Sequence, residues 1–222
     1  MLVIPSPQSR HNNILIRLQQ SDPIFNVGVK VMMPALNFET KYRAPMLTRE
    51  EWSRRPGTPR VVKGLVWYTG WSRMEGTGAR VHGQSVGRRL SISLGSYATV
   101  LQAQVYVILA CACEIQLYVR AEKYVSICSY SQAALKALQT TRPTSPLVRQ
   151  CQKRLNDIST LHAVGLCWAP GYAGARGNEI SDKLARDSSV QKFVGPEPSL
   201  RVSRQNIRRN IKCWLDNKHL AR

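Results

Sequence analysis

The chain has 222 residues and a formal net charge of +19, from 32 lysines and arginines against 13 aspartates and glutamates. Hydrophobic residues make up 43% of it, which is enough for a packed core and excludes a chain that is disordered throughout. The excess positive charge makes nucleic acid the first partner to consider and an anionic membrane surface the second. A basic protein without a specific partner is the simpler alternative.

Residues 1–60 show little helical or strand periodicity. Proline removes a backbone donor and fixes φ, so the prolines spread through this stretch disfavour long helices and central strands. We expect an extended leader, with a short helix at Arg49–Arg54 and a linker at Arg54–Arg60. The prolines are Pro5, Pro7, Pro23, Pro34, Pro45, Pro56 and Pro59.

Three strands are predicted next. Val61–Thr69 is apolar and rich in β-formers, which is typical of a strand buried on both faces. Ala79–Gln84 and Arg88–Leu94 alternate in polarity, which predicts two more strands. We expect a first turn at Gly76–Gly78 and a hairpin turn at Ser85–Gly87.

Ala98–Val119 carries apolar residues at helical spacing and predicts a long helix. Its most apolar run, Val105–Cys113, is shorter than the roughly 20 residues of a membrane span. We therefore expect a buried core helix and no membrane partner. The elements expected after it are strand Lys123–Ser129, helix Ser131–Leu138, helix Leu147–Leu161 opened by Pro146, strand Val164–Ala169, loop Pro170–Gly177 and helix Asn178–Asp187.

The C-terminal part predicts a linker at Gly195–Pro198 and a basic amphipathic helix at Ser203–Asn217. The cations of this helix suit phosphate contacts, or alternatively form a solvated face: Arg204, Arg208, Arg209 and Lys212. The chain thus divides into a Pro-rich leader or connection segment (1–60), one α/β domain (61–190) and a basic tail (191–222). The order of strands and helices predicts a mixed sheet with helices on its faces.

The cysteines form no CxxC pair, and no histidine lies at zinc-ligand spacing from them. They lie in apolar stretches, which indicates reduced thiols packed as small hydrophobic side chains in an intracellular protein. The cysteines are Cys111, Cys113, Cys128, Cys151, Cys167 and Cys213.

Residues Trp168–Ala185 read WAPGYAGARGNEISDKLA. This resembles the last strand, loop and helix of type I ribonuclease H domains, where W-x-P-G-H-x-G-x-x-G-N-E-x-A-D-x-L-A is usual. Three further blocks follow the family's order and spacing: WYTGWS at 67–72, LQAQVY at 101–106 and CSYSQAAL at 128–135. The resemblance covers about residues 61–190, and four blocks in one order are far more specific than any single one.

The resemblance implies a ribonuclease H-like α/β fold. Its mixed five-stranded sheet has three antiparallel strands followed by two parallel ones, with helices on both faces. The flanking NFETKYRAP, PGTP and GPEP segments resemble the ribonuclease H end of a non-LTR retrotransposon polyprotein. There the domain follows a reverse transcriptase, so this chain resembles a C-terminal fragment of such a polyprotein.

Family members cleave the RNA strand of an RNA–DNA hybrid with two Mg²⁺ ions, which four carboxylates hold. The resemblance places these acids at positions where this chain has Gly70, Gln104, Tyr130 and Asp182. The glycine has no ligand atom, the glutamine offers a neutral oxygen and the tyrosine a protonated phenol. Asp182 alone is insufficient for two divalent ions, so bound Mg²⁺ and cleavage are both expected to be lost.

Two neighbouring positions also depart from the family. Tyr172 stands where an assisting histidine is usual, and Trp71 replaces the glycine after the first acid. By resemblance, Ser72, Ser131 and Asn178 correspond to polar residues near the hybrid. Ser131 and Asn178 alternatively cap the helices that follow them.

The sequence thus predicts a ribonuclease H-type pseudoenzyme. One alternative is a nucleic-acid-binding module that holds hybrid or double-stranded RNA through shape and phosphates. A second is a decayed mobile-element reading frame without a selected role, since each lost catalytic residue is one base change from the family residue. A third is an active enzyme in which Glu75 or Glu179 replaces a missing acid, although Glu179 is more simply a first-turn helix residue.

Overall fold

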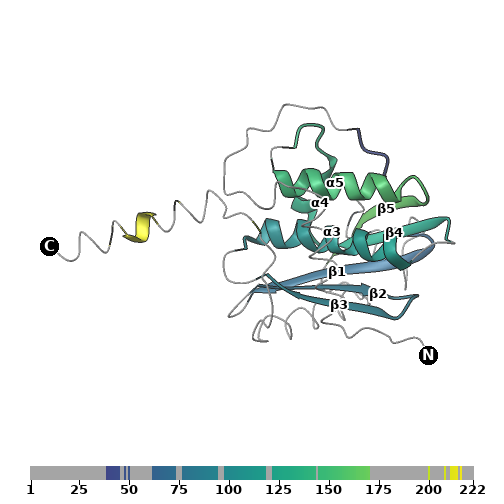
Figure 1. Ribbon diagram of the computed structural model, residues 1–222, viewed down its shortest axis with the longest axis horizontal. Helices are drawn as coiled ribbons and strands as arrows, with labels where there is room; N and C mark the ends of the chain where they lie inside the picture. Colours follow the sequence, from purple (N-terminus) through teal and green to yellow (C-terminus); the bar gives the residue numbers. More distant parts are fainter. Residues whose placement is uncertain are drawn as a thin grey trace.

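The computed structural model describes residues 39–45, 48, 50, 62–73, 77–94, 98–118, 122–143, 145–170, 200, 208, 211–214 and 216. The elements of the central part follow one another as strands and helices of one α/β unit (Figure 1). They are β1 (Leu65–Arg73), β2 (Thr77–Gly83), β3 (Arg88–Ser93), α3 (Val100–Tyr118), β4 (Tyr124–Ser129), α4 (Gln132–Gln139), α5 (Pro146–Ile158) and β5 (Ala163–Trp168).

The five strands form one sheet in the order β3-β2-β1-β4-β5. β2 pairs antiparallel with both β1 and β3, whereas β4 pairs parallel with both β1 and β5. The predicted α/β class is therefore confirmed, as is the mixed sheet with three antiparallel strands followed by two parallel ones.

Glycines set two of the strand boundaries. The hairpin turn between β2 and β3 contains Gly87 at a φ of 62°, where the sequence predicted a turn. The first strand begins at Leu65 rather than at residue 61, after Gly64 at a φ of 66°. The turn predicted at Gly76–Gly78 is wrong for its last two residues. Thr77 and the residue after it already belong to β2, because they pair with the end of β1.

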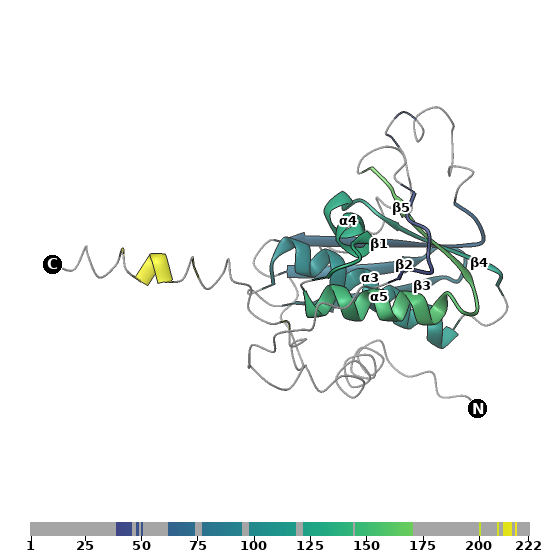
Figure 2. The same cartoon turned by 90° about the horizontal axis from the view of Figure 1, so that it is seen from above.

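Alternate residues of the central strands point to opposite faces of the sheet. Trp67 and Ile127 join the main core with α3, α4 and α5, while Tyr68, Cys128 and Cys167 form a smaller cluster. The first strand is thus buried on both faces, as predicted. Helices α3, α4 and α5 lie on the main-core face (Figures 1 and 2). The helix expected at Asn178–Asp187 lies outside the described residues.

Helix α3 is the central helix of the core. By length and composition alone, its window Val100–Leu117 could cross a membrane. In the fold it packs against β1, β2 and α5, and residues Ile108–Ala112 are fully buried. The prediction of a buried core helix is confirmed, while the absence of a membrane partner stays a prediction.

The predicted helix starts of α4 and α5 are confirmed. Ser131 is the N-cap of α4, because its hydroxyl oxygen accepts a hydrogen bond from the Ala134 N–H at 3.1 Å. Pro146 opens α5, where its missing N–H costs little.

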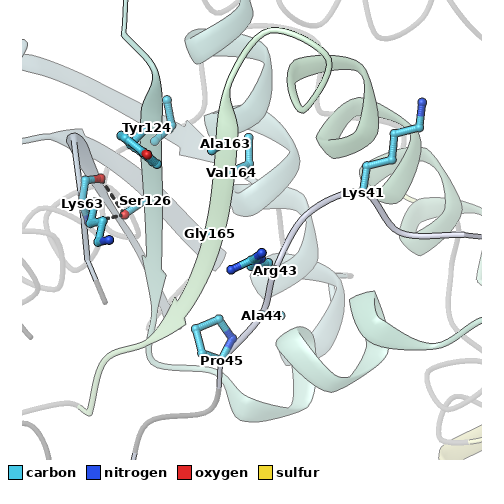
Figure 3. A pocket seen from close by; sticks show the side chains of 11 residues that line it. Lys41, Arg43, Ala44, Pro45, Lys63, Tyr124, Ser126, Ala163, Val164 and Gly165 are labelled. Carbon is cyan, nitrogen blue, oxygen red and sulfur yellow. Dashed lines mark hydrogen bonds between the residues drawn. The ribbon is translucent and has the colours of Figure 1, made fainter. Parts of the chain in front are cut away.

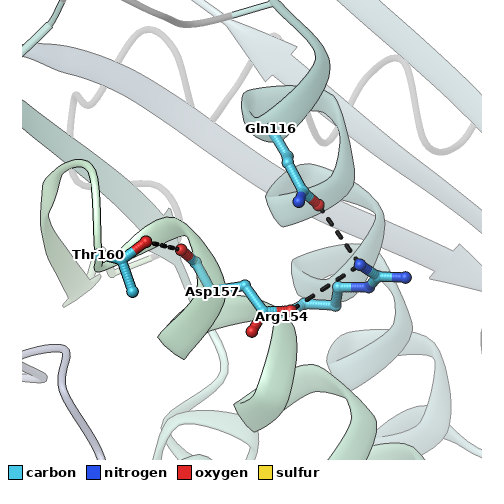
Figure 4. Close-up of polar contacts among 4 residues, drawn as sticks. All are labelled: Gln116, Arg154, Asp157 and Thr160. Atoms are coloured by element: carbon cyan, nitrogen blue, oxygen red, sulfur yellow. Dashed lines mark hydrogen bonds and ion pairs between the residues drawn. The ribbon is translucent and has the colours of Figure 1, made fainter.

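Polar contacts join α5 to α3 and finish its last turn (Figure 4). The Arg154 guanidinium donates to the Gln116 side-chain oxygen at 3.5 Å and lies 3.8 Å from the Asp157 carboxylate. The Thr160 hydroxyl donates to the Asp157 carbonyl at 2.7 Å. These groups are partly exposed, so the ion pair stabilises the fold by at most about 1 kcal/mol.

A short stretch of the Pro-rich leader lies extended along β5. The Arg43 N–H donates to the Val164 carbonyl at 3.1 Å, and the Leu166 N–H donates to the Arg43 carbonyl at 2.7 Å. The Tyr42 hydroxyl reaches the Leu138 carbonyl at 2.5 Å. Residues 39–45 therefore pack on the sheet edge. The division of the chain at residues 60 and 190 stays a prediction.

Most of the thiols are buried, as the sequence predicts. All six cysteines are free; Cys213, in the tail, is exposed, and Cys113 is half-buried. Burial raises the pKa of the Cys111 and Cys151 thiols, which keeps them protonated and unreactive.

The core also contains a polar atom, the Tyr106 hydroxyl oxygen, whose removal should stabilise the fold. The Tyr106 side chain is buried, and its hydroxyl has no hydrogen-bond partner within the described part of the chain. Burial raises the pKa of this phenol. We expect Tyr106→Phe to increase the free energy of unfolding by about 1 kcal/mol, since it removes an unsatisfied buried group. Urea denaturation measures this change.

Tyr42→Phe is the matched control for that experiment. It removes the same atom, but here the hydroxyl donates to the Leu138 carbonyl. We expect this variant to lose about 1 kcal/mol of stability. If both variants lose stability equally, the environment described for the Tyr106 hydroxyl is incorrect.

Candidate functional site

The carboxyl ends of β1 and β4 bring together three of the positions singled out from the sequence. The parallel ladder between the two strands ends one residue before Gly70 and Tyr130, so these are the next positions on neighbouring strands. Gln104 lies near the start of α3, and its side-chain oxygen accepts a hydrogen bond from the Ser131 hydroxyl at 2.5 Å. Because Ser131 directly follows Tyr130, all three positions meet at one edge of the sheet.

Tyr130 completes the edge of β1 where β4 has ended. The phenol oxygen accepts from the Trp71 N–H at 3.0 Å and donates to the Trp71 carbonyl at 2.8 Å. These backbone groups lie beyond the last paired residues of β4, so the phenol substitutes for a missing strand partner. The Tyr130 carbonyl in turn accepts from the Trp168 indole at 3.0 Å. The phenol is therefore a structural group of the sheet edge.

The Gln104 side chain is also committed to a structural contact. The Ser131 hydroxyl accepts from the Ala134 N–H while it donates to the Gln104 oxygen. Both side chains are buried. The capping interpretation of Ser131 is thus confirmed, and its hydroxyl already makes two hydrogen bonds.

The described residues of this edge place a cation, and not an acid, beside Gly70. Gly70 pairs across the sheet with Arg80 of β2, a half-buried cation. Positions 70, 104 and 130 together offer no carboxylate, whereas Mg²⁺ prefers carboxylate oxygens. Within the described ranges, no group of three histidine, cysteine, aspartate or glutamate side chains could hold a metal ion. The donors present at these three positions do not fit two Mg²⁺ ions.

The remaining candidate residues are placed as follows. Ser72 lies in β1, half-buried and paired with β2. Arg208 and Lys212 are helical and exposed, as the predicted tail helix requires. Several other candidates lie outside the described residues: Asp182, Tyr172, Asn178, Arg204, Arg209, Glu75 and Glu179.

Two features of the site were not predicted from the sequence. Arg80 was not singled out, because its position opposite Gly70 depends on the register between β1 and β2. The contact of the Tyr130 phenol with Trp71 was missed as well, because it joins residues 59 positions apart. The one local signal for this contact is that Tyr130 directly follows a predicted strand.

The fold and the site define an α/β domain with a mixed five-stranded sheet and an uncharged network at the edge shared by β1 and β4. No protein-family model matches the sequence, and no curated protein matches it either.

Proposed function

We propose that this chain is a ribonuclease H-like domain that binds nucleic acid, RNA–DNA hybrid in the first place, without cleaving it. The main support for the proposal is that two uncharged side chains, Gln104 and Tyr130, are held by protein hydrogen bonds beside Gly70, which has no side chain. We call these two hydrogen-bonded groups the neutral network. These positions come from the resemblance of four sequence blocks, and they converge on one sheet edge as the resemblance requires. The order and direction of the strands agree with the same fold.

Loss of catalysis follows from the chemistry of the donors. Metal-dependent cleavage needs ions that activate water and stabilise the leaving oxygen, and those ions need carboxylates. Here the glutamine oxygen and the phenol are occupied by protein hydrogen bonds. A remaining Asp182 supplies one negative charge, which is too little to bind two divalent ions.

Binding rests on charge. The chain carries +19, and the cation Arg80 stands beside the place where the family has an acid. A basic surface attracts phosphates regardless of sequence and releases their counterions. The site is therefore suited to the backbone of a nucleic acid rather than to its bases.

Titration of the full chain with a fluorescent RNA–DNA hybrid tests the binding proposal. We expect saturable binding at low salt. Because phosphate contacts release counterions, the affinity should weaken at least tenfold between 50 and 200 mM salt, and about 10³-fold or more if the chain makes six or more phosphate contacts. If the chain has no affinity for the hybrid at 50 mM salt, the proposal is wrong. That result would favour the alternative of a decayed mobile-element fragment without a selected role.

A further inference from the structure

A second basic feature lies at the opposite end of the parallel strands. A cavity of about 910 Å³ opens at the amino ends of β4 and β5, next to Lys63. Tyr130 directly follows β4 and lies six positions after Tyr124, a distance of about 20 Å. The cavity, which we call the amino-end pocket, is thus separate from the site described above.

Cations surround the amino-end pocket. Lys63 and Arg43 line it from opposite sides of β4 and β5, and Lys41 also lines it, with its ammonium group pointing away from the other two (Figure 3). Among the described residues that line it there is no acid. Within the described part of the chain, none of these three cations forms an ion pair. The electrostatic potential in the pocket is therefore expected to be positive and to favour binding of an anion.

The backbone of the pocket is fixed. The Lys63 N–H donates to the Ser126 hydroxyl oxygen at 2.9 Å, and that hydroxyl donates to the Lys63 carbonyl at 2.8 Å (Figure 3). On the other side, Arg43 is held by its backbone pairing with β5 at Gly165. A Cβ added at Gly165 would meet no atom within 4 Å, so this glycine leaves the pocket floor open.

An aromatic ring at the mouth of the pocket narrows the class of anion. The Tyr124 side chain is 41% exposed. The Lys63 and Lys123 ammonium groups lie 5.8 and 5.6 Å from its ring centroid. An exposed ring flanked by cations is the arrangement with which proteins stack a base and contact its neighbouring phosphates. A pocket of this volume is large enough for one nucleotide of a flexible strand.

We propose that the amino-end pocket binds single-stranded nucleic acid, with phosphates at Arg43 and Lys63 and a base stacked on Tyr124. This inference rests on the proposed nucleic-acid-binding function and gives the chain a second contact, about 20 Å from the first. A strand that leaves a hybrid at one end of the sheet would be held at the other.

Binding of a fluorescent 12-nucleotide oligo(dT) to the full chain tests the proposal. The variant Arg43→Gln/Lys63→Gln removes two pocket cations and keeps every backbone contact. The control Lys136→Gln/Lys153→Gln removes two exposed cations of α4 and α5. We expect the pocket variant to bind roughly tenfold more weakly and its salt slope to fall by about 1.4, from about 0.7 for each lost phosphate contact. The control should retain affinity within about threefold.

Two single variants separate stacking from charge. Tyr124→Leu should weaken oligo(dT) binding roughly tenfold but leave the binding of inorganic polyphosphate, which has no bases, unchanged. Gly165→Leu should weaken both probes, because its side chain enters the pocket and not the core. Equal loss of both probes in Tyr124→Leu would contradict the stacking role.

The outcomes distinguish this inference from the proposed function. If the wild-type chain binds hybrid and oligo(dT) but the pocket variant matches the control, the pocket proposal is wrong and the function stands. The same holds if the chain binds hybrid but no single strand. If it binds neither, both proposals fail. Poly-glutamate binding as tight as oligo(dT), and lost in the pocket variant, would assign the pocket to acidic peptides and overturn the proposal.

Discussion

Placing the residues usual in ribonuclease H domains at the positions of resemblance is expected to create metal-dependent cleavage of an RNA–DNA hybrid. The variant combines Gly70→Asp, Gln104→Glu, Tyr130→Asp, Tyr172→His and Trp71→Gly. Because positions 70, 104 and 130 already meet at one sheet edge, new carboxylates there can act on the same ions. We expect a rate at least roughly 10³-fold above the wild-type background, a small part of the 10⁶-fold or greater acceleration typical of enzymes.

The same substitutions remove stabilising contacts, so folding must be measured alongside activity. Tyr130→Asp removes both hydrogen bonds to Trp71, and Trp71→Gly removes a side chain that packs against the core. Circular dichroism reports the fold, and gel analysis of a labelled RNA strand reports cleavage with and without Mg²⁺. The control adds Asp182→Asn, which should abolish the gained activity. A variant that folds and binds the hybrid but does not cleave it would contradict the assignment of positions 70, 104 and 130 as those of the metal-binding acids.

Gly64→Ala is expected to lower the free energy of unfolding more than Gly87→Ala or Tyr42→Phe. Gly64 has a φ of 66°, and a Cβ on it would lie 1.9 Å from the Tyr124 carbonyl oxygen. Left-handed backbone costs a residue with a side chain about 1–2 kcal/mol. The collision adds about 1–3 kcal/mol, because backbone atoms must move. We expect a total loss of about 2–5 kcal/mol in urea denaturation.

Gly87→Ala isolates the collision from the backbone conformation. Gly87 has a similar φ of 62°, but a Cβ on it would meet no atom within 4 Å. This variant should therefore lose only the conformational part, about 1–2 kcal/mol. If the two variants are equally stable, the close approach of Gly64 to β4 is not present in solution.

Much of the fold could be predicted from local patterns, whereas the strand ends could not. The hairpin turn at Gly87 and the cap at Ser131 depend on residue types that act within a few positions. β1, however, runs on to Arg73, because β2 pairs with it along that whole stretch. Pairing of this kind is set by partners distant in sequence, which local periodicity does not encode.

The candidate site was predictable as a set of positions but not as a set of contacts. Resemblance of the blocks placed 70, 104 and 130 together. The parallel pairing of β1 with β4 brings Gly70 and Tyr130 together, and the hydrogen bond with Ser131 brings Gln104 to them. What each replacement does there depends on three-dimensional geometry: the Tyr130 phenol closes the strand edge, and Gln104 binds the helix cap. The amino-end pocket was missed because proline in the leader favoured a separate segment, whereas Arg43 pairs with Gly165.

Incubation of the wild-type chain with labelled RNA–DNA hybrid and Mg²⁺ shows whether the chain binds the hybrid without cleaving it. The neutral network at positions 104 and 130 predicts that the chain binds the hybrid and releases no RNA product. An Asp182→Asn chain prepared in the same way shows whether any trace cleavage belongs to the protein. Metal-dependent product formation by the wild-type chain that Asp182→Asn removes would contradict the proposed loss of catalysis.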